Sequence, residues 1–130
     1  MDIQELRENF SYLTDWEDKY RYLIELGDML PPFPEEAKTA ENKVEGCMSQ
    51  VWFLHTMQGN KHCFSATSDA HIVRGLEAVL LILINDKTTE EIKAVNIEAV
   101  FDELGLSDNL SPTRRNGFYA MVERVHQLIG

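Results

Sequence analysis

A cysteine that directly follows a glycine is the first candidate for chemistry in this sequence. Cys47 comes after Gly46 and shortly before an apolar, β-like run that begins at Val51. The thiolate is the nucleophilic form of cysteine, so a working thiol needs access to solvent or a way to gain it. Glycine gives the chain conformational freedom, and a boundary between loop and strand gives access. From these residues alone, Cys47 is either a reactive thiol or a small buried side chain.

The second cysteine and the histidines are weaker candidates for a reactive site. Cys63 lies inside a strand-like alternation, which favours a packed structural thiol. A cysteine hydrolase would need a histidine to activate the thiol, and His55 and His62 are candidates for that role. No cysteine-protease signature surrounds Cys47, and packing in a half-buried sheet is the alternative for both histidines. The two cysteines and four histidines lack the spacing of a metal site, so no bound metal is expected.

Two arginines stand where a helix normally carries acids. Ser111 and Pro112 predict the start of the last helix, so Arg114 and Arg115 fall in its first turn. The helix dipole disfavours cations there. This placement suggests that they lower the pKa of a thiol or meet an acidic partner surface, and plain solvated charge is the alternative.

Two amphipathic helices are expected in the first part of the chain, before the prolines that begin at residue 31. The first covers residues 2–10, and the second follows a capping box formed by Thr14 and Glu17 and ends near Gly27. The side chains that the second helix should bury recur at 4-3-4 spacing: Trp16, Tyr20, Leu23 and Gly27. Prolines between residues 31 and 34 then require an extended connector. Residues 35–43 are expected to form an exposed loop.

The segment after Cys47 predicts a β-hairpin. Residues 51–58 and 61–67 alternate in hydrophobicity, and Gly59-Asn60 between them is a two-residue turn signal. A short strand is also expected over residues 42–45. The face chosen for the core carries Val51, Phe53, Met57, Phe64 and Ala66, with His55 and His62 among them.

Four helical segments are expected after the hairpin. Residues 70–84 are apolar almost all round, which is typical of a buried central helix, with Ser68 or Asp69 as its cap. Two short helices, capped by Thr88 and Asn96, should end near residues 95 and 104. The last helix should run from Ser111 to about residue 128 and bury Phe118, Val122, Val125 and Ile129. Helices, then strands, then helices indicate an α+β fold.

The composition restricts the class of partner. The 130 residues suit one domain, 1–130, and 44% hydrophobic residues suffice for a core without disulfides. With 12 basic and 22 acidic residues the formal net charge is −10, which argues against nucleic acid and anionic membranes as partners. The acidic first twenty residues contain no signal-peptide pattern, and no apolar run is long enough to span a bilayer. We therefore expect a cytoplasmic protein whose thiols stay reduced.

Four sequence blocks, in order along almost the whole chain, carry a family resemblance. They are residues 16–20 with 26–27, residues 46–52, residues 68–76 and residues 110–117. The most specific is Gly-Cys-Met-Ser-Gln-Val-Trp at residues 46–52. With these blocks the chain resembles the SufE family, including its CsdE branch, of sulfur-acceptor proteins for cysteine desulfurases.

The resemblance implies a fold and a function. The fold would be that of the SufE/IscU superfamily, an α+β domain with a small antiparallel sheet and flanking helices. Cys47 would take sulfur as a persulfide from a SufS- or CsdA-like cysteine desulfurase, stimulate that enzyme, and deliver the sulfur to a SufBCD-like iron–sulfur cluster assembly complex. Asp69 matches a position that influences opening of the cysteine loop, and Arg114 matches an arginine near the same loop.

Under this resemblance the chain is a carrier and not an enzyme by itself. Pyridoxal phosphate would belong to the partner, no cofactor would be bound, and the chain would be a monomer or weak dimer. We further expect Cys47 to point into a shallow apolar pocket and to move out to react. The alternatives are an IscU-like cluster scaffold, which commonly needs three cysteines, a stand-alone thiol enzyme, and an interaction domain with an incidental cysteine.

Overall fold

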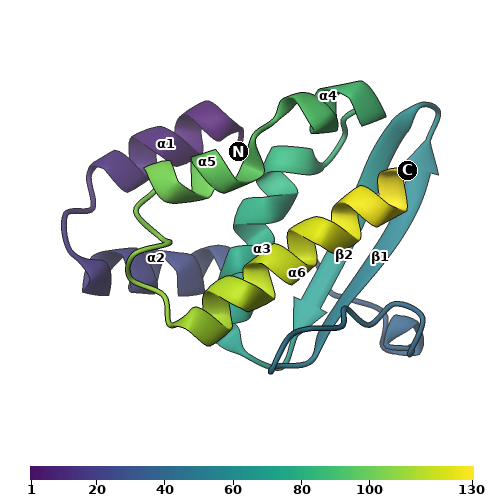
Figure 1. Cartoon of the computed structure of the whole chain (residues 1–130), viewed down its shortest axis with the longest axis horizontal. Coiled ribbons are helices and arrows are strands. Elements are labelled where there is room, and N and C mark those ends of the chain that lie inside the picture. Colours follow the sequence, from purple (N-terminus) through teal and green to yellow (C-terminus); the bar gives the residue numbers. More distant parts are fainter.

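The computed structural model describes residues 1–130, in which helices pack against one side of a β-hairpin (Figure 1). Its helices are α1 (Ile3–Ser11), α2 (Trp16–Asp28), α3 (His71–Ile84), α4 (Thr89–Ala94), α5 (Ile97–Glu103) and α6 (Pro112–Ile129), and its strands are β1 (Val51–Gln58) and β2 (Lys61–Ser68). A short 3-10 helix, Glu35–Ala37, interrupts the connection between α2 and β1. The element order confirms the predicted α+β class. In Figure 1, α3 stands near the centre, with α1 and α2 on one side and the hairpin on the other.

The hairpin forms in the predicted register. Phe53 pairs with Ala66, and Gly59 takes a positive φ of 62° in the tight turn. The face chosen for the core is buried at its hydrophobic positions near the base of the hairpin: Val51, Phe53, Phe64 and Ala66. The short strand expected over residues 42–45 is reduced to an isolated bridge between Lys43 and Trp52, so the sheet has two strands.

Helix α3 is the buried central helix that its composition predicts. Most of its residues after His71 are shielded from solvent. It approaches α2 closely because each helix carries a glycine at the contact. A Cβ atom at Gly75 would overlap the carbonyl oxygen of Leu23, and one at Gly27 would lie 2.7 Å from the backbone nitrogen of Gly75. Larger side chains at either position would push the two helices apart.

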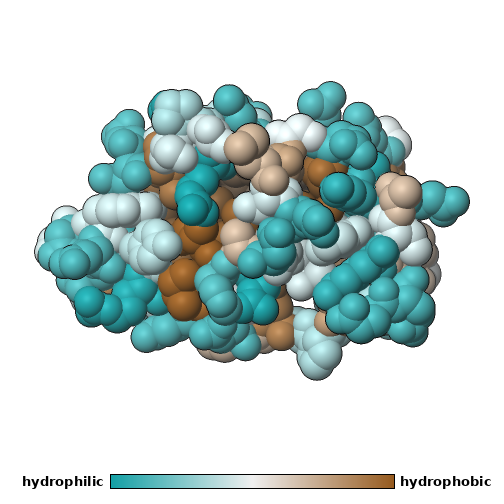
Figure 2. Space-filling view, turned by 90° about the horizontal axis from the view of Figure 1, so that it is seen from below, coloured by the Kyte–Doolittle hydropathy of each residue, from teal (hydrophilic) through white to brown (hydrophobic).

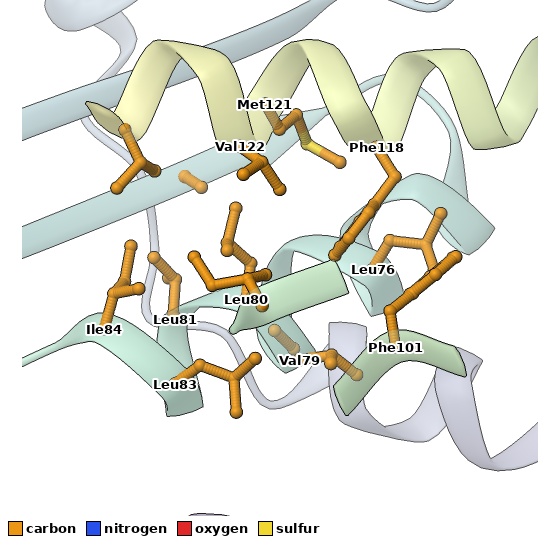
Figure 3. Packing of buried hydrophobic residues seen from close by; sticks show 14 of the residues in the cluster. Leu76, Val79, Leu80, Leu81, Leu83, Ile84, Phe101, Phe118, Met121 and Val122 are labelled. Carbon is orange, nitrogen blue, oxygen red and sulfur yellow. The ribbon is translucent and has the colours of Figure 1, made fainter. Parts of the chain in front are cut away.

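Helix α6 covers α3 with apolar side chains (Figure 3). Phe118, Met121 and Val122 point from α6 into the core, and Phe118 stacks on Phe101 of α5 with ring centroids 4.0 Å apart. The four positions predicted to be buried on the last helix are all buried: Phe118, Val122, Val125 and Ile129. Each such side chain contributes about 1.5–3 kcal/mol on burial, so this packing fixes α6 against α3.

Three helices begin at their predicted caps. The side chains of Thr88, Asn96 and Ser111 each accept a hydrogen bond from a backbone N–H three residues later, at the starts of α4, α5 and α6. Thr88 forms the full capping box with Glu91. These starts are set by short-range hydrogen bonds, which explains why the local sequence predicts them.

The start of α2 differs from the prediction. Asp15, and not Thr14, is the N-cap, and its carboxylate accepts the N–H of Asp18. Both Thr14 and Asp15 have cap chemistry and an acid three residues later, so the local pattern does not separate them. Tyr20, expected in the core, is 40% exposed, whereas Leu26 is buried.

The expected side-chain cap of α3 does not form. The cap residue is Ala70, which has no side-chain bond to the helix. The hydroxyl of Ser68 accepts the N–H of Ala70, and Asp69 bonds to a different part of the chain, described below. Because Asp69 does not cap α3, its side chain is available to bond to the segment before β1.

The surface is largely hydrophilic on the face seen in Figure 2, where hydrophobic side chains gather in a narrow band. The apolar residues are mostly inside, in one core cluster of 30 buried side chains. None of the helices combines the length and the apolar character that crossing a membrane would need.

Candidate functional site

Residues 45–50, here called the Cys47 loop, form a short loop with a fixed base. The backbone N–H of Val44 donates to the carbonyl oxygen of Val51 at 2.8 Å and closes the loop at its ends. Asp69 adds a second closure, because its carboxylate accepts the N–H of Gln50 at 3.0 Å and its own N–H donates to the Gln50 carbonyl at 3.3 Å. The base is therefore held while the tip, with Cys47, is supported by fewer bonds.

Gly46 lets the loop lie close to α6. Its φ of +91° is a left-handed conformation that other residues rarely adopt. A Cβ atom at this position would lie 3.3 Å from the Cβ of Ala120. The glycine predicted to give the loop freedom is thus also required by its backbone angle and its contact with the helix.

The Cys47 thiol points toward α6. Its Sγ donates to the carbonyl oxygen of Gly117 at 3.5 Å, and the side chain is half-buried. A Cβ at Gly117 would lie 3.7 Å from Sγ, an ordinary van der Waals contact, so α6 passes close to the sulfur at this position. The next residue, Met48, is 86% exposed. The loop tip therefore presents one side chain to solvent and turns the thiol inward.

A cavity of about 230 Å³ opens beside the thiol. Val73 and Leu76 of α3 and Phe118 and Met121 of α6 form its apolar wall. Cys47 lines it as well, together with polar residues at the start of α6: Ser111, Thr113 and Arg114. Figure 3 shows Leu76, Phe118 and Met121 converging between the two helices. The expected shallow apolar pocket for Cys47 is thus present.

The cavity does not favour a charged sulfur in this conformation. Burial raises the pKa of the Cys47 thiol, and the nearby carboxyl groups of Glu77 and Glu45 raise it further. Arg114 lines the same cavity, as the resemblance implies for an arginine near the loop. The lowering of the thiol pKa expected from this arginine is not present, because burial and the two acids set the shift and all three raise the pKa. Cys47 rests as a neutral thiol.

The structure brings together Gly46, Cys47, Asp69 and Arg114, which lie in three separate blocks of the sequence. Asp69 bonds to the base of the Cys47 loop, and Arg114 lies at the cavity on the first turn of α6. The four residues proposed from the sequence therefore occupy one site, although their individual roles remain predictions.

Two of the four histidines, His55 and His62, lie on the hairpin away from the Cys47 cavity. His55 Nε2 and His62 Nδ1 are 2.7 Å apart, and His62 Nε2 is 2.7 Å from the hydroxyl of Thr89 at the start of α4. Burial and the neighbouring His62 lower the pKa of His55. This network joins the hairpin to α4, and no histidine lines the cavity beside Cys47.

Cys63 lies on the outer face of the hairpin, opposite Thr56, and is half-buried. The expectation of a fully packed thiol was therefore too strong, because only one face of the sheet is covered by helices. No group of three or more His, Cys, Asp or Glu side chains is arranged to hold a metal ion.

Glu77 is a residue at this site that the sequence analysis did not single out. It lies on α3 directly after Leu76 of the cavity wall, has no exposed surface, and neither carboxyl oxygen has a hydrogen-bond partner. Burial raises its pKa from the ordinary 4.5 to about 9, so it is protonated at neutral pH. The sequence signal that could have identified Glu77 is an acid in an otherwise apolar helix. The sequence does not show which way this side chain faces, because that depends on contacts in the folded structure.

Comparisons with known proteins agree with these features. Residues 4–129 match the SufE family model, described as an Fe-S metabolism associated domain. An uncharacterized SufE-like protein of Rhizobium etli is 44% identical over 129 residues, which are 96% of this chain and 87% of the relative. Another, from Rhizobium meliloti, is 42% identical over 127 residues, which are 95% of this chain and 91% of the relative.

A solved structure has the same fold at low sequence identity. The solution structure of a hypothetical protein from Thermus thermophilus superposes with a TM-score of 0.78 at 19% identity, over 98% of this chain and 92% of that one. The family match supports a sulfur-transfer accessory role in iron–sulfur metabolism. From the match over almost its whole length and the two close relatives, this chain belongs to the SufE family.

Proposed function

We propose that Cys47 accepts sulfur from a pyridoxal-phosphate cysteine desulfurase as a persulfide and passes it to an iron–sulfur cluster assembly complex. The observation that carries the proposal is the position of the thiol, at the tip of a loop with a fixed base and beside an apolar cavity of about 230 Å³. Membership of the SufE family supports the same interpretation.

The transfer is an exchange at sulfur. The Cys47 thiolate attacks the outer sulfur of a persulfide on the desulfurase, and a new sulfur–sulfur bond forms while the bond in the donor breaks. The donor cysteine leaves as a thiolate, and Cys47 becomes a persulfide. A second attack by an acceptor thiolate on the outer sulfur repeats the exchange. No external oxidant or reductant is consumed in either step.

The resting conformation protects the sulfur but does not allow attack. The half-buried thiol, bonded to the Gly117 carbonyl, is neutral, whereas the exchange requires an exposed thiolate. The tip of the Cys47 loop must therefore move away from α6 to react. After loading, the cavity has room for one further sulfur atom, since a water molecule in the liquid occupies only about 30 Å³.

Asp69 would control the opening of the Cys47 loop, and Arg114 would contribute to docking of the partner. The paired bonds between Asp69 and Gln50 hold the base of the loop, so Asp69 limits how readily the loop opens. Arg114, on the first turn of α6 beside the cavity, would meet acidic groups of the docked partner.

The charge of the molecule fits association with proteins. A net charge of −10 favours approach to a basic surface on the desulfurase or on the assembly complex. Docking of the chain would stimulate the desulfurase by removing the sulfur that occupies its cysteine. The reaction belongs in the cytoplasm, where thiols are kept reduced.

The test is intact-protein mass spectrometry after incubation with a cysteine desulfurase and free cysteine, without reductant. The wild-type chain should gain one sulfur that maps to Cys47 and is lost on reduction. Cys47→Ser should gain none, and the matched variant Cys63→Ser should gain it as the wild type does. Absence of added sulfur, with an active desulfurase that binds the chain, would overturn the proposal.

A further inference from the structure

The carboxyl group of Glu77 is isolated in the interior of the protein. Its residue has 0% exposed surface, and both carboxyl oxygens lack a hydrogen-bond partner. An unpartnered buried acid is costly, because water would solvate it far better. The shape of the fold alone does not require a carboxyl group here, since an apolar side chain of similar size would fill the same volume.

Glu77 lies behind the wall of the cavity beside Cys47. On α3 it directly follows Leu76 and comes one turn after Val73, and both of those side chains line the cavity. When ionised, it raises the pKa of Cys47 more than Glu45 does, although Glu45 is only two residues from Cys47 in the chain. The carboxyl group and the thiol are therefore electrostatic neighbours across the cavity wall.

The surrounding charges leave Glu77 without a neutralising partner. Arg74, one turn earlier on α3, favours the charged form of Glu77, but this effect is smaller than the effect of burial. The Arg74 guanidinium contacts the ring of His71 and lies 3.7 Å from the carboxylate of Asp28 on α2.

The other elements around Glu77 bring few charges to it. The inward face of the hairpin near the Cys47 loop has no charged side chain: it consists of Val51, Phe53, Ala66 and Ser68. Helix α6 brings Arg114 to the cavity, and the Cys47 loop brings Glu45. The removal of water is thus the main reason that Glu77 keeps its proton.

We propose that Glu77 is a positioning residue for Cys47: the closed Cys47 loop keeps the Glu77 carboxyl dry and protonated, and opening of the loop admits water to it, so that opening and loss of the Glu77 proton form one coupled step. The proton passes to solvent. The relevance to sulfur delivery rests on the proposed function, whereas the coupling itself concerns only this chain.

The coupling makes the reaction rate of Cys47 depend on the loss of two protons. The first is lost by the thiol itself, which can ionise once the loop is open. If opening also ionises Glu77, the open population rises about tenfold per pH unit between the ordinary pKa of 4.5 and the raised value of about 9. The rate of thiolate chemistry at Cys47 should then rise about 100-fold per pH unit near neutrality, and not about 10-fold.

The effect is measured from the alkylation rate of Cys47 by iodoacetamide between about pH 6 and pH 8. Cys63→Ser is the background, so that only one thiol reacts. In this background the rate should rise about 100-fold per pH unit, and adding Glu77→Gln should reduce this to about 10-fold. Glu77→Leu should behave as Glu77→Gln does, and Glu98→Gln, an exposed charge change on α5, should keep the steep profile.

The outcomes are decisive in either direction. A steep profile that becomes shallow only in the two Glu77 variants supports the coupling. A shallow profile with Glu77 intact overturns it, even if a variant does not fold. Equal slopes with and without Glu77 also overturn it. Because no desulfurase takes part, a chain with the steep profile that accepts no sulfur would refute the proposed function alone.

Discussion

The buried acid on α3 predicts that the stability of this protein falls as pH rises. Glu77 has its pKa raised from 4.5 to about 9 in the folded state. The stabilisation is therefore fully present below the unfolded pKa and is lost as pH rises toward the folded pKa. Within that window the unfolded chain binds fewer protons than the native one, and the free energy of unfolding decreases by about 1.4 kcal/mol per pH unit.

The size of the effect at neutral pH follows from the same values. At pH 7, which is about 2.5 units above the ordinary pKa, Glu77 lowers the free energy of unfolding by about 3.4 kcal/mol. Glu77→Leu removes this penalty and fills the same space, so it should be more stable by about 3 kcal/mol at pH 7. Glu77→Gln retains an unpartnered polar group worth about 1–3 kcal/mol, so its gain at pH 7 should be smaller.

The assay is urea denaturation at several pH values between about 5 and 8. The difference in free energy of unfolding between Glu77→Gln and the wild type should grow by about 1.4 kcal/mol for each pH unit, with unchanged m values. Glu98→Gln serves as the control, because its side chain is exposed on α5, and its curve should stay parallel to that of the wild type. A Glu77→Gln difference that does not change with pH would refute the reasoning, whatever its size.

Three other substitutions test the geometry of the Cys47 loop. Asp69→Ala removes the 3.0 Å bond to Gln50, worth about 0.5–1.5 kcal/mol, and should raise the alkylation rate of Cys47 about 2- to 10-fold; an unchanged rate would show that the bond does not hold the loop. Gly46→Ala places a side chain at a φ of +91° and should lower the free energy of unfolding by about 1–2 kcal/mol in urea titrations; an undiminished value would contradict the strain argument. Arg114→Ala should slow sulfur transfer from a desulfurase in single-turnover experiments while the thermal unfolding midpoint stays the same; wild-type rates and affinity would remove its proposed role.

Local sequence signals predicted the elements well where short-range bonds decide them. The caps of α4, α5 and α6 and the register of the hairpin depend on residues within a few positions of one another. The start of α2 was misplaced by one residue because Thr14 and Asp15 compete with the same chemistry. The short strand over residues 42–45 was overestimated because its extent depends on pairing with β1 and not on its own sequence.

Contacts between distant segments explain what sequence reasoning missed. Asp69 looked like a helix cap because its local surroundings offer that role, but in the fold Gln50 is its partner, 19 residues away. Glu77 is an acid within an apolar helix, and its burial became visible only in the packed structure, where none of its surface is exposed. Gly46, Cys47 and Arg114 were singled out from their local sequence, and Asp69 took its site role from the family pattern. Their meeting at one cavity required the arrangement of α3 and α6.

The fixed base of the Cys47 loop also limits how far the sulfur can travel. Val44 is buried and bonded to Val51, so the movable chain begins at Glu45, and Cys47 is only three residues from the fixed Val44. Three residues span at most about 10 Å along the backbone when fully extended, which limits how far the Cα of Cys47 can move from the base. A donor or acceptor must therefore bring its own sulfur close to the first turns of α6. Cys47 could not reach a partner cysteine at the bottom of a deep, narrow channel. It could exchange sulfur with a cysteine in a shallow opening or on a protruding segment.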